Sequence, residues 1–307
     1  MDFSLVIPIH NEAQSLKLLF QSLNLVLKDL GKSYEYICVD DGSTDRSFQI
    51  LEDIHKQYAH VRVVQLRKRS GKSAALTAGF HYAQGRAIVT IDADLQDDAA
   101  AIPKLLETID SGQDVVCGWR KFRKDSFVKV TSSWFFNIII RWFTRTHLHD
   151  INTGLKVYRA AVLQEIEIYG GLYRFLPVLA AQAGFRVAEI PVHHYERKFG
   201  KSKYSASKLI DGFLDFLTVL LLTKYSQKPA HFFGGAGLMS FLLGFAISLY
   251  LSIEWFSGVH PIGNRPLFFL GILLLIVGVQ LISLGLLGEV LISGQKKKTY
   301  HIRRMLD

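Results

Sequence analysis

The sequence predicts an α/β domain with a mainly parallel sheet, followed by amphipathic interface helices and two transmembrane helices. Two observations lead to this prediction. In residues 1–118, short apolar runs alternate with segments of helical periodicity, a pattern typical of a parallel sheet covered by helices on both faces. After residue 207, hydrophobic residues gather into long uncharged runs. The chain is therefore expected to join a water-facing domain to a membrane part.

The expected strands and helices alternate along the first part of the chain. Strands are expected at 3–9, 34–39, 61–66, 87–91 and 114–118, and helices at 11–30, 45–58, 73–84 and 102–111. The first helix carries its leucines on one face, and Ser43 or Thr44 is the expected N-cap of the second. Because ligands of such sheets bind at the carboxyl ends of the strands, the polar loops after the strands are expected to converge.

Two uncharged apolar runs, 232–253 and 267–288, are each long enough to span a hydrocarbon core, which takes roughly 20 helical residues. The loop between them carries only Arg265, whereas both flanks carry several Lys and Arg residues. The positive-inside rule therefore predicts that both ends of the chain are cytoplasmic. Two amphipathic stretches, 126–145 and 207–225, are expected at the membrane interface, although a core helix with a few exposed cations is an alternative for the first.

These composition changes set the expected domain boundaries. Residues 1–205 are predicted to form a cytoplasmic domain, 206–230 an amphipathic juxtamembrane segment, 231–292 a two-helix hairpin and 293–307 a basic tail. Glycines at 234, 235 and 237 offer a face through which membrane helices can associate. The sequence therefore leaves open whether the protein forms a homo-oligomer.

The charge and cysteine content narrow the function. The formal net charge is +9, which suits nucleic acid, an anionic membrane or a phosphorylated substrate. The apolar runs favour the last two, and we expect no nucleic-acid partner. Cys38 and Cys117 lie in strand-like runs without metal-ligand spacing, and we interpret both as buried thiols in a reducing compartment. The N-terminus lacks the basic and apolar regions of a signal peptide.

The stretch DADLQDD follows the apolar run that ends at residue 91. Asp92 and Asp94 point the same way if the chain is extended there, and with the Gln96 amide oxygen they form a set suited to Mg²⁺ or Mn²⁺. Such a cation could bridge the phosphates of a nucleotide. A solvated acidic loop is the alternative, and Asp97 and Asp98 are interpreted as no more than a solvated helix start.

Three other strand ends carry polar residues. The carboxylates of Asp40 and Asp41, in DDGSTD, are suited to ribose hydroxyls or a base N–H, with a helix N-cap as the alternative, and Glu12 could reach the same nucleotide. Lys72 follows Gly71, but Leu66 occupies the position of the first glycine of a Walker A loop, so that motif is excluded. A Gly-Lys pair at a helix start can still attract an anion, and a plain surface lysine is an equal alternative.

Two polar segments further along the chain complete the candidate site. Asp150, in DINTG, is a candidate active-site carboxylate. The basic run 195–204 is interpreted either as an interfacial patch or as a mobile loop that closes over a diphosphate or a lipid phosphate. Arg120 and its basic neighbours after the fifth strand could form a second anion site.

Seven stretches in this order resemble the family-2 glycosyltransferases of GT-A fold: VIPIHNE, VDDGSTD, GKSAALTAGF, DADLQDD, DINTGLKVYR, EIPVHHYER and GKSKYS. Within that family they are most similar to polyprenyl-phosphate glycosyltransferases of the dolichol-phosphate mannose synthase and bacterial undecaprenyl-phosphate glucosyltransferase types. The resemblance covers nearly the whole chain. It implies a GT-A (Rossmann-like) domain on the cytoplasmic side of the inner membrane, in contact with the lipid bilayer.

The resemblance also implies an activity. It is the metal-dependent, inverting transfer of a hexose from a nucleotide-sugar donor to polyprenyl phosphate, for cell-envelope glycan modification. UDP-glucose is the first expectation for the donor and GDP-mannose the second.

Residue roles follow from the matched motifs. The residues implied to bind the nucleotide-sugar are Pro8, Glu12, Asp40, Asp41, Lys72 and Asp92. Asp94 and Gln96 would hold Mg²⁺ or Mn²⁺, and Asp150 and Arg197 are the implied catalytic residues. The lipid-phosphate-binding residues would be Arg120, Ser202 and Lys203. The chain departs from the common pattern at Asp98, where many relatives have Pro, and at His10, where Tyr is common.

Two other classes of protein were weighed against this one. A processive polysaccharide synthase of the same fold usually carries a Gln-x-x-Arg-Trp motif and more spans, and the sequence contains neither. A non-catalytic membrane scaffold would not need to keep DADLQ and DINTG intact.

Overall fold

The computed structural model describes residues 1–121, 148–166, 172–196, 199, 229–258 and 265–293. The chain divides into two compact units, Met1–Val219 and Leu220–Asp307. The expected amphipathic stretches 126–145 and 207–225, and the site candidates Arg197, Ser202 and Lys203, lie outside the described residues. The finer domain boundaries stay a prediction.

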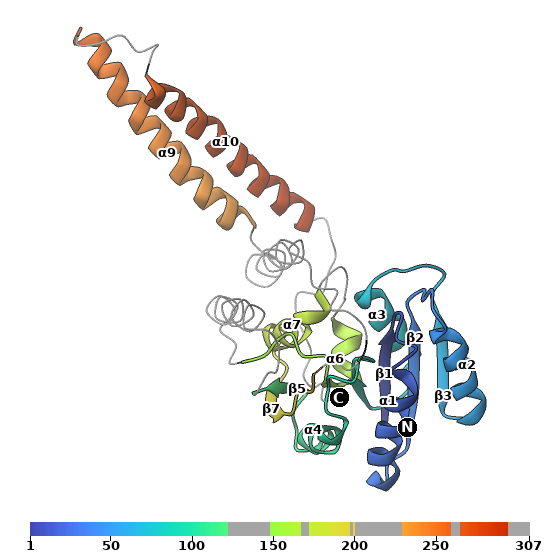
Figure 1. Cartoon of the computed structure of the whole chain (residues 1–307). Helices are drawn as coiled ribbons and strands as arrows, with labels where there is room; N and C mark the ends of the chain where they lie inside the picture. Colours follow the sequence, from blue (N-terminus) through green and yellow to red (C-terminus); the bar gives the residue numbers. More distant parts are fainter. Residues whose placement is uncertain (122–147, 167–171, 197–198, 200–228, 259–264, 294–307) are drawn as a thin grey trace. The chain divides into compact units, whose positions relative to one another are not determined.

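The first unit contains a seven-stranded sheet of order β3-β2-β1-β4-β6-β5-β7 (Figure 1). Its strands are β1 Phe3–Ile9, β2 Tyr34–Asp40, β3 Val61–Gln65, β4 Ala87–Thr90, β5 Val115–Arg120, β6 Lys156–Arg159 and β7 Val187–Val192. Only β6 runs antiparallel to its neighbours, β4 and β5. The predicted α/β domain with a mainly parallel sheet is confirmed.

Helices cover both faces of the sheet because successive strand residues point to opposite sides. In β1, Leu5 and Ile7 pack into one core cluster and Val6 into another. The helices are α1 Leu16–Leu27, α2 Ser47–Gln57, α3 Lys72–Tyr82, α4 Ile102–Asp110, α6 Ala160–Glu165 and α7 Leu176–Gln182, with 3₁₀ turns η1 Lys28–Leu30, η2 Ala99–Ala101 and η3 Leu172–Arg174. Helices α1, α2 and α4 pack on the first face, and α3, α6 and α7 on the second.

Both cysteines are buried and free, as expected. Cys117 packs beside Val115 and Tyr158 in the core between β5, β6 and the helices of the second face. Burial raises the pKa of the Cys117 thiol to about 12. Neither thiol is therefore a reactive group near neutral pH.

The start of α2 differs from the prediction. The helix begins at Ser47, whose backbone N–H donates to Asp45 Oδ1 at 2.9 Å. Ser43 and Thr44 do not cap it: Ser43 Oγ accepts from the backbone N–H of Asn11, and Thr44 Oγ1 accepts from the Asn11 amide. The cap prediction was wrong because these hydroxyls bind the neighbouring loop instead of their own helix.

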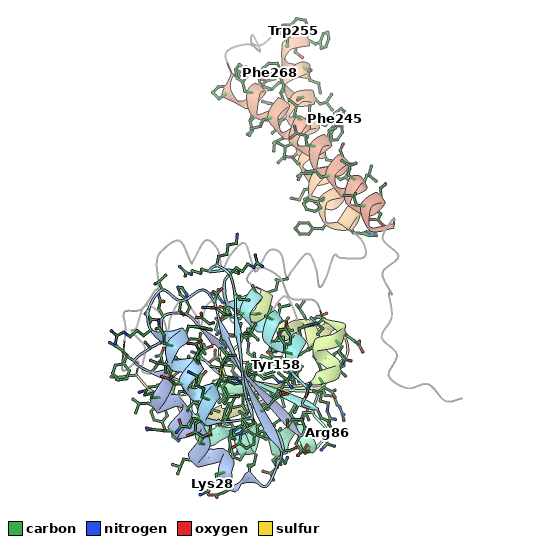
Figure 2. All side chains as sticks on the ribbon, turned by 90° about the vertical axis from the view of Figure 1, so that its right-hand side faces the viewer. Lys28, Arg86, Tyr158, Phe245, Trp255 and Phe268 are labelled. Carbon is green, nitrogen blue, oxygen red and sulfur yellow. The ribbon has the colours of Figure 1, made fainter. Side chains whose placement is uncertain are left out.

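The second unit contains two long apolar helices, α9 Pro229–Phe256 and α10 Pro266–Ser293 (Figure 1). Both are long and apolar enough to cross a membrane, with mean hydropathy 1.9 and 2.7, and only 17% and 11% of their most apolar windows are buried. Phe245 and Trp255 are among the exposed large side chains, and Figure 2 labels both on the hairpin. A helix in the core of a soluble protein would bury far more of this surface, so the two helices match the predicted membrane spans.

Glycines bring the backbones of α9 and α10 together. A Cβ atom built on Gly237 would lie 2.7 Å from the carbonyl oxygen of Gly278, and one on Gly244 would lie 2.7 Å from that of Gly271. By contrast, a Cβ atom on Gly234 or Gly235 would meet nothing within 4 Å. Of the three glycines considered for association, Gly237 therefore packs inside the hairpin.

Gly278→Ala is expected to destabilise the hairpin, because the added Cβ would lie 2.7 Å from the Phe241 backbone nitrogen and 2.8 Å from the Gly237 carbonyl oxygen. Overpacking of this kind costs about 1–3 kcal/mol. The measurement is the temperature at which half of the full-length protein is lost from the monodisperse peak in detergent. Gly235→Ala is the matched control, since its Cβ enters open space. Equal loss temperatures for the two variants would contradict the close packing.

Candidate active site

Hydrogen bonds join the loops that follow β1 and β2. The side-chain oxygen of Asn11 accepts from the backbone N–H of Thr44 at 2.8 Å. The backbone N–H of Glu12 donates to Ser47 Oγ at 2.9 Å. Asn11 adopts a left-handed backbone conformation with φ +56, which turns the chain sharply after β1. Glu12, and Pro8 near the end of β1, therefore lie beside the DDGSTD loop.

The two neighbouring carboxylates of DDGSTD are both buried and both hydrogen-bonded to protein groups. Asp40, which is 0% exposed, accepts from the backbone N–H of Ser43 and from the amide of Gln65, each at 3.2 Å. Asp41 accepts from the backbone N–H of Gly71 at 2.9 Å. These carboxylates hold the loops after β2 and β3 in place, and their predicted contact with a nucleoside stays a prediction.

Lys72, the first residue of α3, forms an ion pair with Asp92, which follows β4. The Lys72 ammonium also lies 5.2 Å from the centre of the Tyr173 ring. Burial alone lowers the pKa of this ammonium, but the charge of Asp92 and the hydrogen bond to it outweigh burial and raise it. Burial likewise raises the pKa of Asp92, and the Lys72 charge reverses that shift to a net lowering. Both groups are therefore charged at neutral pH, and Lys72 is not the plain surface lysine of the alternative interpretation.

The remainder of DADLQDD forms a tight turn. Leu95 has φ +62, and Asp94 Oδ1 accepts from the backbone N–H of Gln96 at 3.2 Å. The segment after β7 supports this turn: the backbone N–H of Tyr195 donates to the Gln96 carbonyl at 3.0 Å, and Gln96 Nε2 donates to the Tyr195 carbonyl at 3.3 Å. Because the Gln96 amide nitrogen is used in this way, its side-chain oxygen is left as a donor atom for a cation.

The last two aspartates of the stretch have different environments. Asp98 Oδ1 accepts from the backbone N–H of Ala100 at 3.1 Å and caps η2, so its interpretation as a helix start is confirmed. The expectation that it is solvated was wrong, because Asp98 is buried. Asp97 is no solvated residue: it pairs with His194 in an isolated β-bridge, and its Oδ2 accepts from the backbone N–H of Asp92 at 3.2 Å. Burial, and then the charge of Asp92, raise the pKa of Asp97 to about 7. Sequence alone could not separate the two.

Gly154 of DINTG brings the next loop against these acids. A Cβ atom at this position would lie 2.5 Å from Asp97 Oδ2 and 2.6 Å from Asp92 Oδ2, so any side chain here would have to displace these carboxylates. The Gly154 carbonyl oxygen also accepts from Thr90 Oγ1 at 2.8 Å. The DADLQDD and DINTG motifs, far apart in the sequence, thus meet in one site.

Asp150 is held from two sides. Its carboxylate forms a two-point ion pair with Arg120, in which Nε donates at 2.7 Å and Nη2 at 3.0 Å. Its backbone N–H donates to Glu189 Oε1 at 2.9 Å, and Glu189 Oε2 accepts from the backbone N–H of His149 at 2.7 Å. Arg120 was expected to bind a lipid phosphate. In this structure it neutralises and orients Asp150.

Positive and negative charges alternate around Gly154. Four carboxylates gather there, and three cations are interleaved with them: Asp92, Asp94, Asp97 and Asp150, with Lys72, Arg120 and Lys156. Lys72 neutralises Asp92, Arg120 neutralises Asp150, and the raised pKa of Asp97 leaves part of that group protonated at neutral pH. Asp94 lies in the same turn, and its charge contributes to raising the pKa of Asp97.

The oxygen donors at this turn fit a small divalent cation bound together with a substrate. Among the described residues, no group of three or more His, Cys, Asp or Glu side chains is placed to hold a metal alone. Mg²⁺ and Mn²⁺ are commonly held by one or two carboxylates plus substrate phosphates. Asp94 and the Gln96 oxygen would be the protein ligands of such a cation. The phosphates of a nucleotide would fill the remaining coordination positions.

Three residues of the site were missed from the sequence. Glu189 stands at the start of the apolar run EIPV, Lys156 lies inside the apolar run LKVY, and Tyr173 lies in a turn. Glu189 and Lys156 could have been found from the sequence, because each is an ionisable residue within a strand-like run. A buried ionisable group needs a partner. Tyr173 carries no comparable signal, because a tyrosine in a turn is unremarkable.

Comparisons with known proteins agree with this geometry. Residues 4–167 match the model of glycosyl transferase family 2. The chain is 36% identical over 316 residues to a dodecaprenyl-phosphate galacturonate synthase of Rhizobium johnstonii, covering 100% of this chain and 94% of that protein. It is 35% identical over 294 residues to an undecaprenyl-phosphate 4-deoxy-4-formamido-L-arabinose transferase of Yersinia enterocolitica, covering 93% and 86%.

A solved structure shares the fold. Glucosyl-3-phosphoglycerate synthase from Mycobacterium tuberculosis, in complex with Mn²⁺, UDP and phosphoglyceric acid, superposes with TM-score 0.56 at 18% identity, over 72% of this chain and 78% of that one. A sheet of this kind, with an acidic turn after its central strand, is the GT-A fold. The chain belongs to glycosyltransferase family 2, and the relatives it matches along its length are polyprenyl-phosphate glycosyltransferases.

Gly154→Ala is expected to lower the transfer rate by about 100-fold, because displacing a reacting group by about 1 Å costs that much and the new Cβ collides with Asp92 and Asp97. The measurement is the rate of sugar transfer alongside the melting temperature. The control is Gly31→Ala, which strains a left-handed backbone with φ +62 in open space at the end of η1. That variant should lose stability and keep activity. Equal activity loss in both variants would contradict a local effect.

Asp97→Asn is expected to gain stability over the parent protein as the pH rises. The pKa of Asp97 is about 7 in the folded chain against 3.8 for a free aspartate, so the folded state favours the proton. The stability from that proton is present below about pH 4 and is lost as the pH rises through about 7. Asn mimics the protonated group. The melting temperatures of variant and parent are measured in EDTA. The difference, variant minus parent, should grow by a few °C from about pH 5 to about pH 8. A difference that does not change with pH would contradict the raised pKa of Asp97.

Proposed function

We propose that the protein transfers one sugar from a nucleotide diphosphate donor to the phosphate of a polyprenyl lipid, with inversion at the anomeric carbon. The observation that carries this proposal is the contact of Gly154 with Asp92 and Asp97. It joins the acidic turn, suited to a diphosphate and its cation, to the loop that carries Asp150. The similarity to polyprenyl-phosphate glycosyltransferases over the full length of the chain supports the same reaction.

The chemistry asks little of a general base. An oxygen of the acceptor phosphate attacks the anomeric carbon from the face opposite the donor diphosphate. The new carbon–oxygen bond forms as the bond to the diphosphate breaks, and the diphosphate leaves with the electron pair. Because the acceptor phosphate is already anionic near neutral pH, the site must mainly position two anions and stabilise the leaving group. The two-point ion pair of Asp150 with Arg120 supports an orienting role for Asp150.

The cations of the site divide this task. Lys72, which is paired with Asp92 in this structure, is proposed to contact the donor phosphates. Asp94 and Gln96 would hold Mg²⁺ or Mn²⁺, which when bound neutralises charge on the departing diphosphate. Arg197, Ser202 and Lys203 belong to the loop proposed to hold the acceptor phosphate. Pro8, Glu12, Asp40 and Asp41 form the wall proposed for the nucleoside.

The membrane hairpin supplies the lipid side of the reaction. We propose that α9 and α10 span the inner membrane with both ends of the chain cytoplasmic, which fits the charge of the flanks. A polyprenyl phosphate can then reach the domain from the membrane surface. UDP-glucose remains the first proposed donor and GDP-mannose the second. The sugars named for the relatives, galacturonate and 4-deoxy-4-formamido-L-arabinose, make nucleotide forms of these two the next candidates.

A donor panel tests this function. The full chain in vesicles with undecaprenyl phosphate and Mn²⁺ is expected to form one glycolipid, read by mass spectrometry, from one member of the panel. Asp94→Ala should abolish the product while the protein stays folded, because it removes a cation ligand. Asp29→Ala, an exposed acid on η1, is the control and should stay active. Absence of a glycolipid with every donor would refute the transferase proposal, and full activity in EDTA would refute the metal alone.

A further inference from the structure

Lys156 is a buried ammonium in the middle of the sheet. It opens β6, where it lies opposite Thr90 of β4 and Cys117 of β5. Its exposure is 3%, and the next two residues of the strand, Val157 and Tyr158, are as buried. Figure 2 shows Tyr158 well inside the domain. None of the roles assigned above uses this lysine.

The ammonium has little direct compensation. Its Nζ donates to the carbonyl oxygen of Arg174 at 3.3 Å. Within the described part of the chain, no carboxylate lies within ion-pair distance of it. Taking an ammonium out of water without a paired carboxylate is costly. A chain that needed only to fill this space would do better with an apolar side chain.

Two carboxylates of the site compensate Lys156 from a distance. Burial, and to a lesser extent the charge of Lys72, lower the pKa of its ammonium to about 8. Asp150 and Asp92 act in the opposite direction and favour the charged form. The geometry agrees, because Lys156 lies opposite Thr90, whose hydroxyl donates to the Gly154 carbonyl oxygen, and Gly154 lies against Asp92.

Lys72 cannot serve two anions fully at once. It pairs with Asp92 in this structure, and the proposed function gives it the donor phosphates. When Lys72 turns to a diphosphate, Asp92 loses its counter-charge unless another cation replaces it. We propose that Lys156 is the positioning residue that keeps Asp92 neutralised while Lys72 engages the donor. This role rests on the proposed function.

A second contact links Lys156 to the same lysine. The Arg174 carbonyl that it binds belongs to η3, and Tyr173 of that turn holds its ring 5.2 Å from the Lys72 ammonium. Arg174 Nε also donates to the Tyr173 hydroxyl at 3.1 Å. Lys156 thus holds in place the turn that Lys72 packs against. It also compensates the negative charge of Asp92 when Lys72 moves to the donor.

Stability and function make opposite predictions for Lys156→Met. Methionine has a similar length and carries no charge, so it removes the cost of burying an ammonium. If Lys156 serves the site, the melting temperature stays the same or rises while donor affinity falls. If it serves only the fold, stability and affinity fall together.

The experiment measures binding of UDP, with GDP as a second probe, to the full chain in detergent by titration calorimetry, with Mn²⁺ and again in EDTA. We expect Lys156→Met to weaken nucleotide binding by about tenfold in both conditions, with an unchanged or higher melting temperature. In transfer assays KM for the donor should rise more than kcat falls. Lys156→Arg, which keeps the charge, should recover part of the affinity if it folds.

Lys104→Met, at an exposed position on α4, is the matched control and should change neither affinity nor stability. Parent-like nucleotide affinity in Lys156→Met would overturn the role, and so would a fall in melting temperature in step with affinity. If the parent protein binds neither nucleotide, the proposed function itself fails, and this role fails with it.

Discussion

Negative charge crowded at one edge of the sheet is the constraint on which the rest of the domain depends. Asp92 and Asp97 lie against Gly154, which offers no side chain there, and Asp150 belongs to the same loop as this glycine. Such an arrangement is stable only if cations stand among the acids. The chain draws them from separate elements: Lys72 from α3, Arg120 from the end of β5, and a buried lysine from β6.

The loops around this edge are held in place by carboxylates, some of which the sequence suggests as groups that bind a ligand. Asp40 accepts from a backbone N–H of its own loop, and Asp41 from one of the loop after β3. Glu189 accepts from two backbone N–H groups of the loop that carries Asp150. A carboxylate that organises backbone N–H groups keeps a loop in one conformation without ligand. The site therefore enters binding largely preformed, which reduces the entropy lost when a nucleotide is ordered.

The sequence was enough to predict the parallel part of the sheet and the acidic members of the site, because apolar runs and strand-end acids are local patterns. It could not predict β6, since Lys156 interrupts the apolar run and a lysine normally signals exposure. Burial of that lysine is tolerable only with Asp92 and Asp150 nearby, which is a tertiary fact. The pairs Lys72–Asp92 and Arg120–Asp150 join distant segments. The sequence therefore identified these four residues but not which of them form ion pairs.

The glycine packing of the hairpin also limits where a lipid can go. With the backbones of α9 and α10 in near contact at Gly237 and Gly278, no acyl-sized gap remains between the two helices there. Apolar side chains such as Phe245 and Leu286 lie instead on the outward faces of the hairpin. Between these glycines the two helices pack as one unit, and the apolar surface of the hairpin is the outer one.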